Sequence, residues 1–172
     1  MMKGYIQVYT GNGKGKTTAA LGLAVRAIGA GKKVFFAQFI KGSVYSEMNI
    51  VQKMLPAITL KQYGLCCFIE KDPTEKDIEA ARHGLAQVAE IIKSGKYDLV
   101  VLDEANMAMY FNLFSIDELL SIVQNKPEHL EIVITGRKAP QELIELADLV
   151  TEMKEVKHYY QKGIEAREGI EY

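Results

Sequence analysis

The residues best suited to chemistry lie in TGNGKGKTT, at positions 10–18. Gly15, Lys16 and Thr17 match the second half of the phosphate-binding pattern GxxxxGK[ST], and Thr10 stands where the first glycine is expected. Glycines let a loop turn successive backbone N–H groups toward an anion, and a lysine adds a point charge for phosphate oxygens. An apolar run precedes this stretch and a helical pattern follows it, so phosphate binding is favoured over a glycine turn with solvated lysines.

A hydroxyl and two carboxylates predict a Mg²⁺ site beside this loop. Thr17 offers the hydroxyl, and the apolar run YDLVVLDEA ends in Asp103 and Glu104. Mg²⁺ takes a few well-placed oxygen ligands and leaves the rest of its shell to phosphates and water. The sequence leaves open which carboxylate binds the metal, and also whether Asp103 only caps the next element. Together these motifs indicate an ATP-type nucleotide bound with Mg²⁺.

Two further cations follow predicted strands. Arg137 comes after VITG and Lys41 after AQFI. Ligands of open α/β sheets bind at the carboxyl edge of the strands, so Arg137 is placed to hold phosphate oxygens bidentately. Lys41 either adds to this anion site, contacts a substrate that bears carboxylates or amides, or is simply solvated. The alternative for Arg137 is an exposed side chain that forms surface ion pairs.

These residues need a scaffold, which the alternation of short apolar runs with helical patterns provides. Strands are expected over residues 5–9, 33–39, 58–62, 97–103, 131–135 and 149–153. Helices are expected over residues 17–30, 46–54, 75–93, 115–124 and 141–147. This order predicts an α/β protein with helices around a mostly parallel sheet of about six strands. One domain over residues 1–172 is expected, with 154–172 as an irregular C-terminal segment.

The composition excludes several classes of protein. The 172 residues carry a formal net charge of -1, which provides no general attraction to nucleic acid or to an anionic membrane. Apolar runs fall far short of a membrane span and the N-terminus lacks a signal-peptide stretch, so a cytoplasmic protein is expected. Cys66 and Cys67 are adjacent, which suits neither an ordinary disulfide nor a zinc site.

The stretches TGNGKGKTTAALGLAVRAIGAGKKVFFAQFIKG, DLVVLDE, VITGR and ADLVTEM, with the ending VKHYYQKGIEAREGIEY, resemble P-loop ATP:corrinoid adenosyltransferases. The resemblance runs from about residue 5 to the C-terminus. It implies a three-layer RecA-like P-loop NTPase fold with the triphosphate held in reversed orientation. It also implies a reaction in which Co(I) of a reduced corrinoid attacks the 5′ carbon of ATP, giving an adenosylcorrinoid and inorganic triphosphate.

In this reaction the corrinoid supplies the nucleophile, so no catalytic acid or base is assigned. Lys14 and Lys16 would stabilise the departing triphosphate, whose charge grows as the carbon–oxygen bond breaks. Mg²⁺ would be held by Thr17 with Asp103 or Glu104. The residues expected to bind ATP are Gly11, Asn12, Gly13, Lys14, Gly15, Lys16, Thr17, Thr18 and Arg137.

The residues that would bind the corrinoid are less clearly indicated by the sequence than those that would bind ATP. Phe39, Lys41, Leu65 and Phe68 are the expected contacts. Where some members of the family carry a Phe and a Trp, this chain has YGLCCFIEKD and no Trp. The aromatic residues Tyr63, Phe68, Tyr110 and Phe111 either form a platform for a planar ligand or pack in the core.

The resemblance further implies a homodimer and an electron-donating flavoprotein. The sequence also starts only a few residues before the first expected strand, so an N-terminal arm over the corrinoid is not expected. The alternative functions are a kinase or small NTPase acting at the γ-phosphate, and a nucleotide-dependent binding module, because P-loops serve several chemistries.

Overall fold

The computed structural model describes residues 3–40, 42, 46–65 and 72–171. At its centre lies a six-stranded sheet in the order β3-β2-β4-β5-β1-β6, in which every neighbouring pair is parallel. The strands are β1 (Ile6–Thr10), β2 (Val34–Gln38), β3 (Ile58–Gln62), β4 (Leu99–Asp103), β5 (Glu131–Thr135) and β6 (Leu149–Glu152). All six expected strands are present, and β3 and β5 have the predicted bounds.

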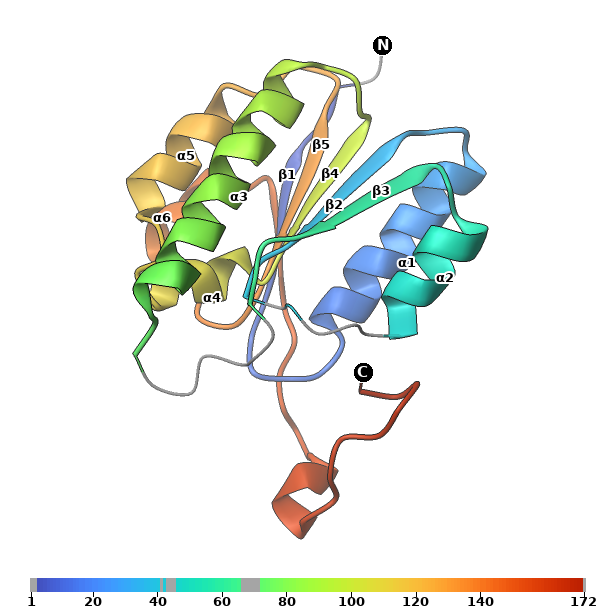
Figure 1. Ribbon diagram of the computed structural model, residues 1–172, viewed down its shortest axis with the longest axis vertical. Helices are drawn as coiled ribbons and strands as arrows, with labels where there is room; N and C mark the ends of the chain where they lie inside the picture. Colours follow the sequence, from blue (N-terminus) through green and yellow to red (C-terminus); the bar gives the residue numbers. More distant parts are fainter. Residues whose placement is uncertain (1–2, 41, 43–45, 66–71, 172) are drawn as a thin grey trace.

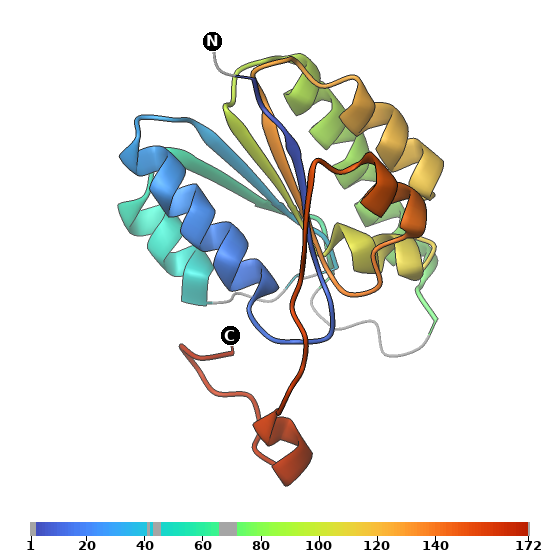
Figure 2. The ribbon, with the colours of Figure 1, turned by 180° about the vertical axis from the view of Figure 1, so that it is seen from behind.

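Helices cover both faces of the sheet (Figures 1 and 2). One face carries α1 (Lys16–Gly29) and α2 (Ser46–Met54). The other carries α3 (Glu75–Lys93), α4 (Ala105–Tyr110), α5 (Ile116–Gln124) and α6 (Gln141–Leu146). Each face encloses its own group of buried apolar side chains. The expected three-layer, RecA-like α/β arrangement is thereby confirmed.

Burial along the strands follows from this layering. Every residue of β2 and β4 is buried, because both strands lie inside the sheet and have helices on both sides. At the sheet edge, all four residues of β6 are exposed. The central strands can therefore bring polar side chains to the carboxyl edge while the rest of their length is held by the core.

Local signals define the long helices. Thr74 accepts a hydrogen bond from the backbone N–H of Asp77, and the Asp77 side chain accepts one in return, which forms a capping box at the start of α3. Ser115 and Glu118 form the same arrangement at the start of α5. The start of α3 matches the sequence prediction, and α5 starts one residue after the predicted residue 115.

The strand register brings polar residues together at the carboxyl edge. Gln38 at the end of β2 lies beside Asp103 at the end of β4. Thr135 at the end of β5 pairs with Tyr9, one residue before Thr10 ends β1. A site at this edge therefore draws on four strands that are distant in the chain.

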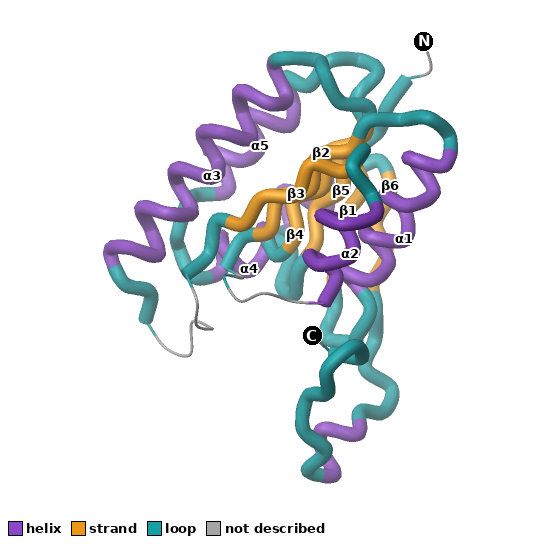
Figure 3. Tube along the Cα trace, turned by 45° about the vertical axis from the view of Figure 1, so that its right-hand side comes forward, coloured by secondary structure: helices purple, strands orange, loops and turns teal. Residues whose placement is uncertain are grey.

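Beyond β6, the chain leaves the sheet and forms a projection below its carboxyl edge (Figure 3). This C-terminal segment, residues 154–171, contains the short 3-10 helix η1 (Tyr159–Lys162). Its end turns back toward the start of α1 in both ribbon views (Figures 1 and 2). Within the described ranges, none of the helices has the length and apolar character needed to cross a membrane.

Candidate nucleotide site

The phosphate loop connects β1 to α1 and encloses its own lysine. Lys16 Nζ donates hydrogen bonds of 2.8 Å to the Gly11 carbonyl and 2.7 Å to the Gly13 carbonyl. Gly11 and Gly15 have φ angles of 94° and 117°, in the left-handed region that side chains disfavour. Lys16 is consequently held at the centre of the loop, where the first turn of α1 also directs backbone N–H groups.

A second requirement for glycine comes from the chain that follows β6. A Cβ added to Gly11 would lie 2.4 Å from the Met153 carbonyl oxygen. One added to Gly13 would lie 2.7 Å from that oxygen and 2.8 Å from the Lys154 carbonyl oxygen. The Gly13 N–H also donates to Met153 O at 2.7 Å. The loop is thus pressed against backbone more than 130 residues later in the chain.

Asp103 connects the loop to the strand ends. It is fully buried, and its Oδ1 accepts hydrogen bonds from Thr17 Oγ1 at 2.9 Å and Thr135 Oγ1 at 2.7 Å. Gln38 Nε2 lies 3.4 Å from Oδ2. These bonds hold the carboxylate against the first turn of α1. A hydroxyl and a carboxylate therefore converge in the way that a Mg²⁺ site requires.

Glu104 occupies a different position. Its φ of 59° is left-handed, and its backbone N–H donates to Thr135 Oγ1 at 3.1 Å. Glu104, not Asp103, is the residue preceding the first turn of α4, and it makes no side-chain cap. Asp103 is therefore directed into the site and does not cap the next helix. The short α4 itself was not predicted from the sequence.

A hollow of about 470 Å³ lies over the loop, a size typical of small-molecule sites. Lys14, Lys16 and Arg137 contribute positive charge to its lining, and Glu47, Glu104 and Glu171 contribute negative charge. Of the residues expected to bind ATP, it brings together Asn12, Gly13, Lys14, Gly15, Lys16, Thr17, Thr18 and Arg137. Gly11 is not part of the lining, and its carbonyl instead holds Lys16.

Comparison with known proteins shows the family to which the chain with this site belongs. The family model described as ATP:corrinoid adenosyltransferase BtuR/CobO/CobP matches residues 2–172. The chain belongs to this family.

Individual adenosyltransferases show similarity over the same length. The corrinoid adenosyltransferase of Escherichia coli K12 is 35% identical over 171 residues, which span 99% of this chain and 86% of the relative. That of Pseudomonas aeruginosa is 36% identical, over 99% of this chain and 84% of the relative. Corrinoid adenosyltransferase CobA of Salmonella typhimurium is 37% identical, over 99% and 86%.

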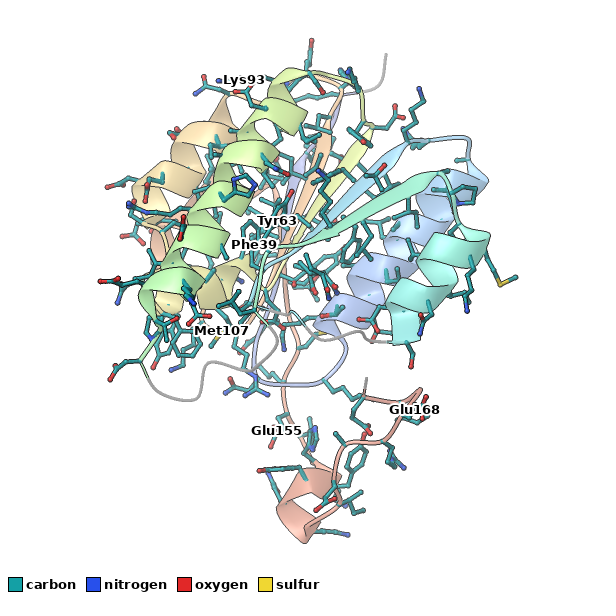
Figure 4. All side chains as sticks on the ribbon, in the orientation of Figure 1. Phe39, Tyr63, Lys93, Met107, Glu155 and Glu168 are labelled. Atoms are coloured by element: carbon teal, nitrogen blue, oxygen red, sulfur yellow. The ribbon has the colours of Figure 1, made fainter. Side chains whose placement is uncertain are left out.

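The residues expected to contact the corrinoid in this adenosyltransferase differ in their exposure to solvent. Phe39 is fully buried, and its ring packs 5.7 Å from Tyr63 and 5.3 Å from Phe114, measured between centroids (Figure 4). Its expected contact with the corrinoid is corrected to a core position, because the side chain is fully enclosed by other buried apolar residues. Leu65 is exposed. Lys41 and Phe68 lie outside the described residues, as do Cys66 and Cys67.

The remaining aromatic residues do not form one platform. Tyr63 belongs to the core, and Phe111 is partly buried and packs against that core. Tyr110 is about half exposed, and Lys138 Nζ lies 3.5 Å from the centre of its ring. Core packing therefore explains Tyr63, and a cation–π contact accounts for the position of Tyr110.

Sequence reasoning missed part of the lining. Ser46 and Glu47 reach the hollow from the start of α2, and His158, Gly169, Ile170 and Glu171 reach it from the C-terminal segment. The ending VKHYYQKGIEAREGIEY was marked by its irregular pattern and by its part in the family resemblance, but neither signal placed it at the hollow. Thr135, which ends a predicted strand, and Gln38, one residue before the end of the strand predicted over 33–39, were also missed. Among the described residues, no three His, Cys, Asp or Glu side chains gather as a metal site of their own.

Proposed function

We propose that this chain transfers the 5′-deoxyadenosyl group of ATP to the Co(I) centre of a reduced corrinoid and releases inorganic triphosphate. The observation that carries the proposal is a phosphate loop opening into a 470 Å³ hollow in a chain that matches the adenosyltransferase family over residues 2–172. The curated relatives are named corrinoid adenosyltransferases.

The reaction requires little acid–base chemistry from the protein. The electron pair of Co(I) forms the cobalt–carbon bond while the bond from C5′ to oxygen breaks, and the leaving oxygen keeps its electron pair as part of triphosphate. Stabilising that charge is the main electrostatic task, which donors preorganised in a loop perform without rearranging. Lys16 and the loop N–H groups are proposed for this role, together with Arg137, which also lines the hollow.

Mg²⁺ is proposed as the companion of the triphosphate. The donor set fits it, because the Thr17 hydroxyl and the Asp103 carboxylate lie 2.9 Å apart at the loop. Bound Mg²⁺ would neutralise phosphate charge. Glu104, which lines the hollow, is proposed as the alternative carboxylate ligand.

Positioning supplies the rest of the rate enhancement. Bringing the cobalt and C5′ into line is worth roughly 7 to 11 kcal/mol when the geometry is fixed in advance. We also propose that the enzyme is a single domain, forms a homodimer and lies in the cytoplasm. An electron-donating flavoprotein is its proposed partner. These points rest on the sequence pattern and the family resemblance.

The test is an anaerobic assay with ATP, Mg²⁺ and chemically reduced cobalamin. The loss of Co(I) absorbance is followed while the phosphate products are separated. A light-sensitive cobalt–carbon product, formed in equal amount with triphosphate, is the expected result. Persistence of Co(I) with release of ADP or phosphate would overturn the proposal in favour of a γ-phosphate enzyme.

Lys16→Ala tests the phosphate loop directly, and Lys93→Ala is its control. The Lys16 ammonium holds two loop carbonyls and would contact phosphate, so ATP-dependent adenosylation should be abolished while the fold is nearly intact by circular dichroism. Lys93→Ala removes an exposed lysine at the end of α3, far from the loop, and should retain full activity (Figure 4).

A further inference from the structure

The C-terminal segment contacts the phosphate loop through Lys14. Lys14 Nζ donates a 2.8 Å hydrogen bond to the Ile170 carbonyl and lies 3.2 Å from Glu171 Oε1. The two partners are 156 and 157 residues away in the chain. Lys14 is the loop cation that the general phosphate-binding pattern does not require. Its position is therefore set by the end of the chain and not by the loop alone.

Glu171 is itself held firmly by its own segment. Its carboxylate accepts hydrogen bonds from the Tyr159 hydroxyl and from Arg167, through Nε at 3.2 Å, Nη2 at 3.3 Å and the backbone N–H at 2.8 Å. The Arg167 and Tyr159 donors hold the pKa of Glu171 far below its usual range. Glu171 is thus an ionised, multiply hydrogen-bonded partner for Lys14 at neutral pH.

The contact leaves Lys14 able to bind an anion. An ammonium group has three N–H donors, and the segment takes two of them. Lys14 and Glu171 both line the hollow over the loop. Arg167 offsets the charge of Glu171, so the cluster of Lys14, Glu171 and Arg167 keeps a net positive charge. Such a cluster attracts a polyanion and presents Lys14 to it in a fixed position.

We infer that Glu171 is a positioning residue of the triphosphate site: it orients the Lys14 ammonium toward phosphate oxygens in the hollow. This inference rests on the proposed function and deepens it, because it assigns the C-terminal segment a role in binding the triphosphate. A flexible lysine loses side-chain entropy when it binds phosphate, and a partner that orients it beforehand reduces that loss.

The test measures binding of inorganic triphosphate, with Mg²⁺, to the full-length protein by titration calorimetry. Glu171→Gln keeps the size of the side chain but weakens its hold on Lys14, and affinity should fall by about tenfold, as expected for losing one charge-assisted contact. The control is Glu168→Gln, which changes an exposed carboxylate of the same segment and should leave affinity unchanged (Figure 4).

A double-mutant cycle separates positioning from simple loosening of the segment. In a Lys14→Ala background, Glu171→Gln should have no further effect on triphosphate affinity. An equal loss in both backgrounds would show that Glu171 only holds the fold, and would overturn the inference. So would tighter binding by Glu171→Gln, which would make Glu171 a competitor of phosphate, and so would an unchanged affinity.

The binding readout also separates this inference from the proposed reaction. If the unaltered protein binds triphosphate and Glu171→Gln weakens that binding, while reduced cobalamin is never adenosylated, then the positioning role stands and the proposed reaction fails. If adenosylation proceeds and the cycle shows no coupling between Lys14 and Glu171, then the reaction stands and the positioning role fails.

Discussion

The Thr17 hydroxyl donates a 2.9 Å hydrogen bond to Oδ1 of Asp103, although 86 residues separate the two in the chain. The contact joins the first turn of α1 to the end of β4. Thr135 donates to the same oxygen from β5, so Asp103 fixes the loop relative to two central strands. A buried carboxylate held in this way is costly unless its charge is used or compensated.

Replacing Asp103 with Asn should impair Mg²⁺ use far more than folding. The amide keeps the shape of the side chain but removes the charge that attracts a divalent cation. The Mg²⁺ concentration that supports half-maximal adenosylation should rise by about 10-fold to 100-fold. Measuring the rate against Mg²⁺ concentration at saturating ATP gives this value directly.

Two companion variants make the Asp103 result decisive. Asp117→Asn changes an exposed carboxylate in the first turn of α5 and should leave the Mg²⁺ dependence unaltered. Glu104→Gln should have a smaller effect than Asp103→Asn. A larger effect from Glu104→Gln would assign the metal to Glu104 instead.

Gly13→Ala should separate the phosphate loop from the C-terminal segment. The new Cβ would meet the Met153 and Lys154 carbonyl oxygens at 2.7 and 2.8 Å, so backbone must shift. Overpacking of this kind costs typically about 1–3 kcal/mol of unfolding free energy. ATP affinity should fall as well, because the same shift displaces the loop. Urea unfolding and ATP titration measure the two effects.

Gly22→Ala is the matched control for Gly13→Ala. Gly22 lies within α1, and a Cβ there has no neighbouring atom within 4 Å. Alanine in an open helical position should stabilise the protein by about 0.5–1 kcal/mol and leave ATP affinity unchanged. Equal destabilisation by both variants would contradict the proposed close approach of loop and segment.

The scaffold was largely predictable because its signals are local. Strand β3 and helices α2 and α3 have the expected bounds, since apolar periodicity and capping residues such as Thr74 act over a few neighbours. Asp103 was predicted near Thr17 because the carboxyl ends of parallel strands share one edge. The six-residue α4 escaped prediction because it starts from a left-handed Glu104, which no sequence signal marks.

The long-range contacts of the site could not be predicted in this way. Nothing in the sequence singles out Glu171 as the partner of Lys14, because the chain contains 22 acidic and 21 basic residues. Phe39 shows the opposite problem. Phe39, at the end of the strand expected over 33–39, was expected to contact the corrinoid, yet it is fully buried and packs against Tyr63 and Phe114. Packing between layers decides such positions.

Gly84→Ala should disrupt the contact between α3 and the sheet. A Cβ at Gly84 would lie 2.4 Å from Cγ of the Tyr63 ring, which is buried and has little room to move. We expect a loss of about 1–3 kcal/mol of unfolding free energy, even though alanine favours a helix more than glycine does. Urea unfolding followed by circular dichroism measures it, and a more stable Gly84→Ala protein would refute the close packing.

Tyr63 should make stability fall at high pH. Burial raises the pKa of its hydroxyl to about 12 from an ordinary value of 10. Below pH 10 the hydroxyl is protonated in both the folded and the unfolded chain, so its contribution is fully present. Between pH 10 and 12 only the unfolded chain loses the proton, which favours unfolding by as much as about 2 kcal/mol.

Comparison with Tyr63→Phe isolates this effect from all other titrating groups. The variant lacks the 3.0 Å hydrogen bond from Tyr63 Oη to Gln87, so it should be less stable by a constant amount of about 1 kcal/mol up to pH 10. Above pH 10 the difference should shrink and then change sign, because only the unaltered protein has a phenol to ionise on unfolding. Urea unfolding at pH 8, 10 and 11.5 tests this, and a difference that stays constant to the highest pH would contradict the raised pKa.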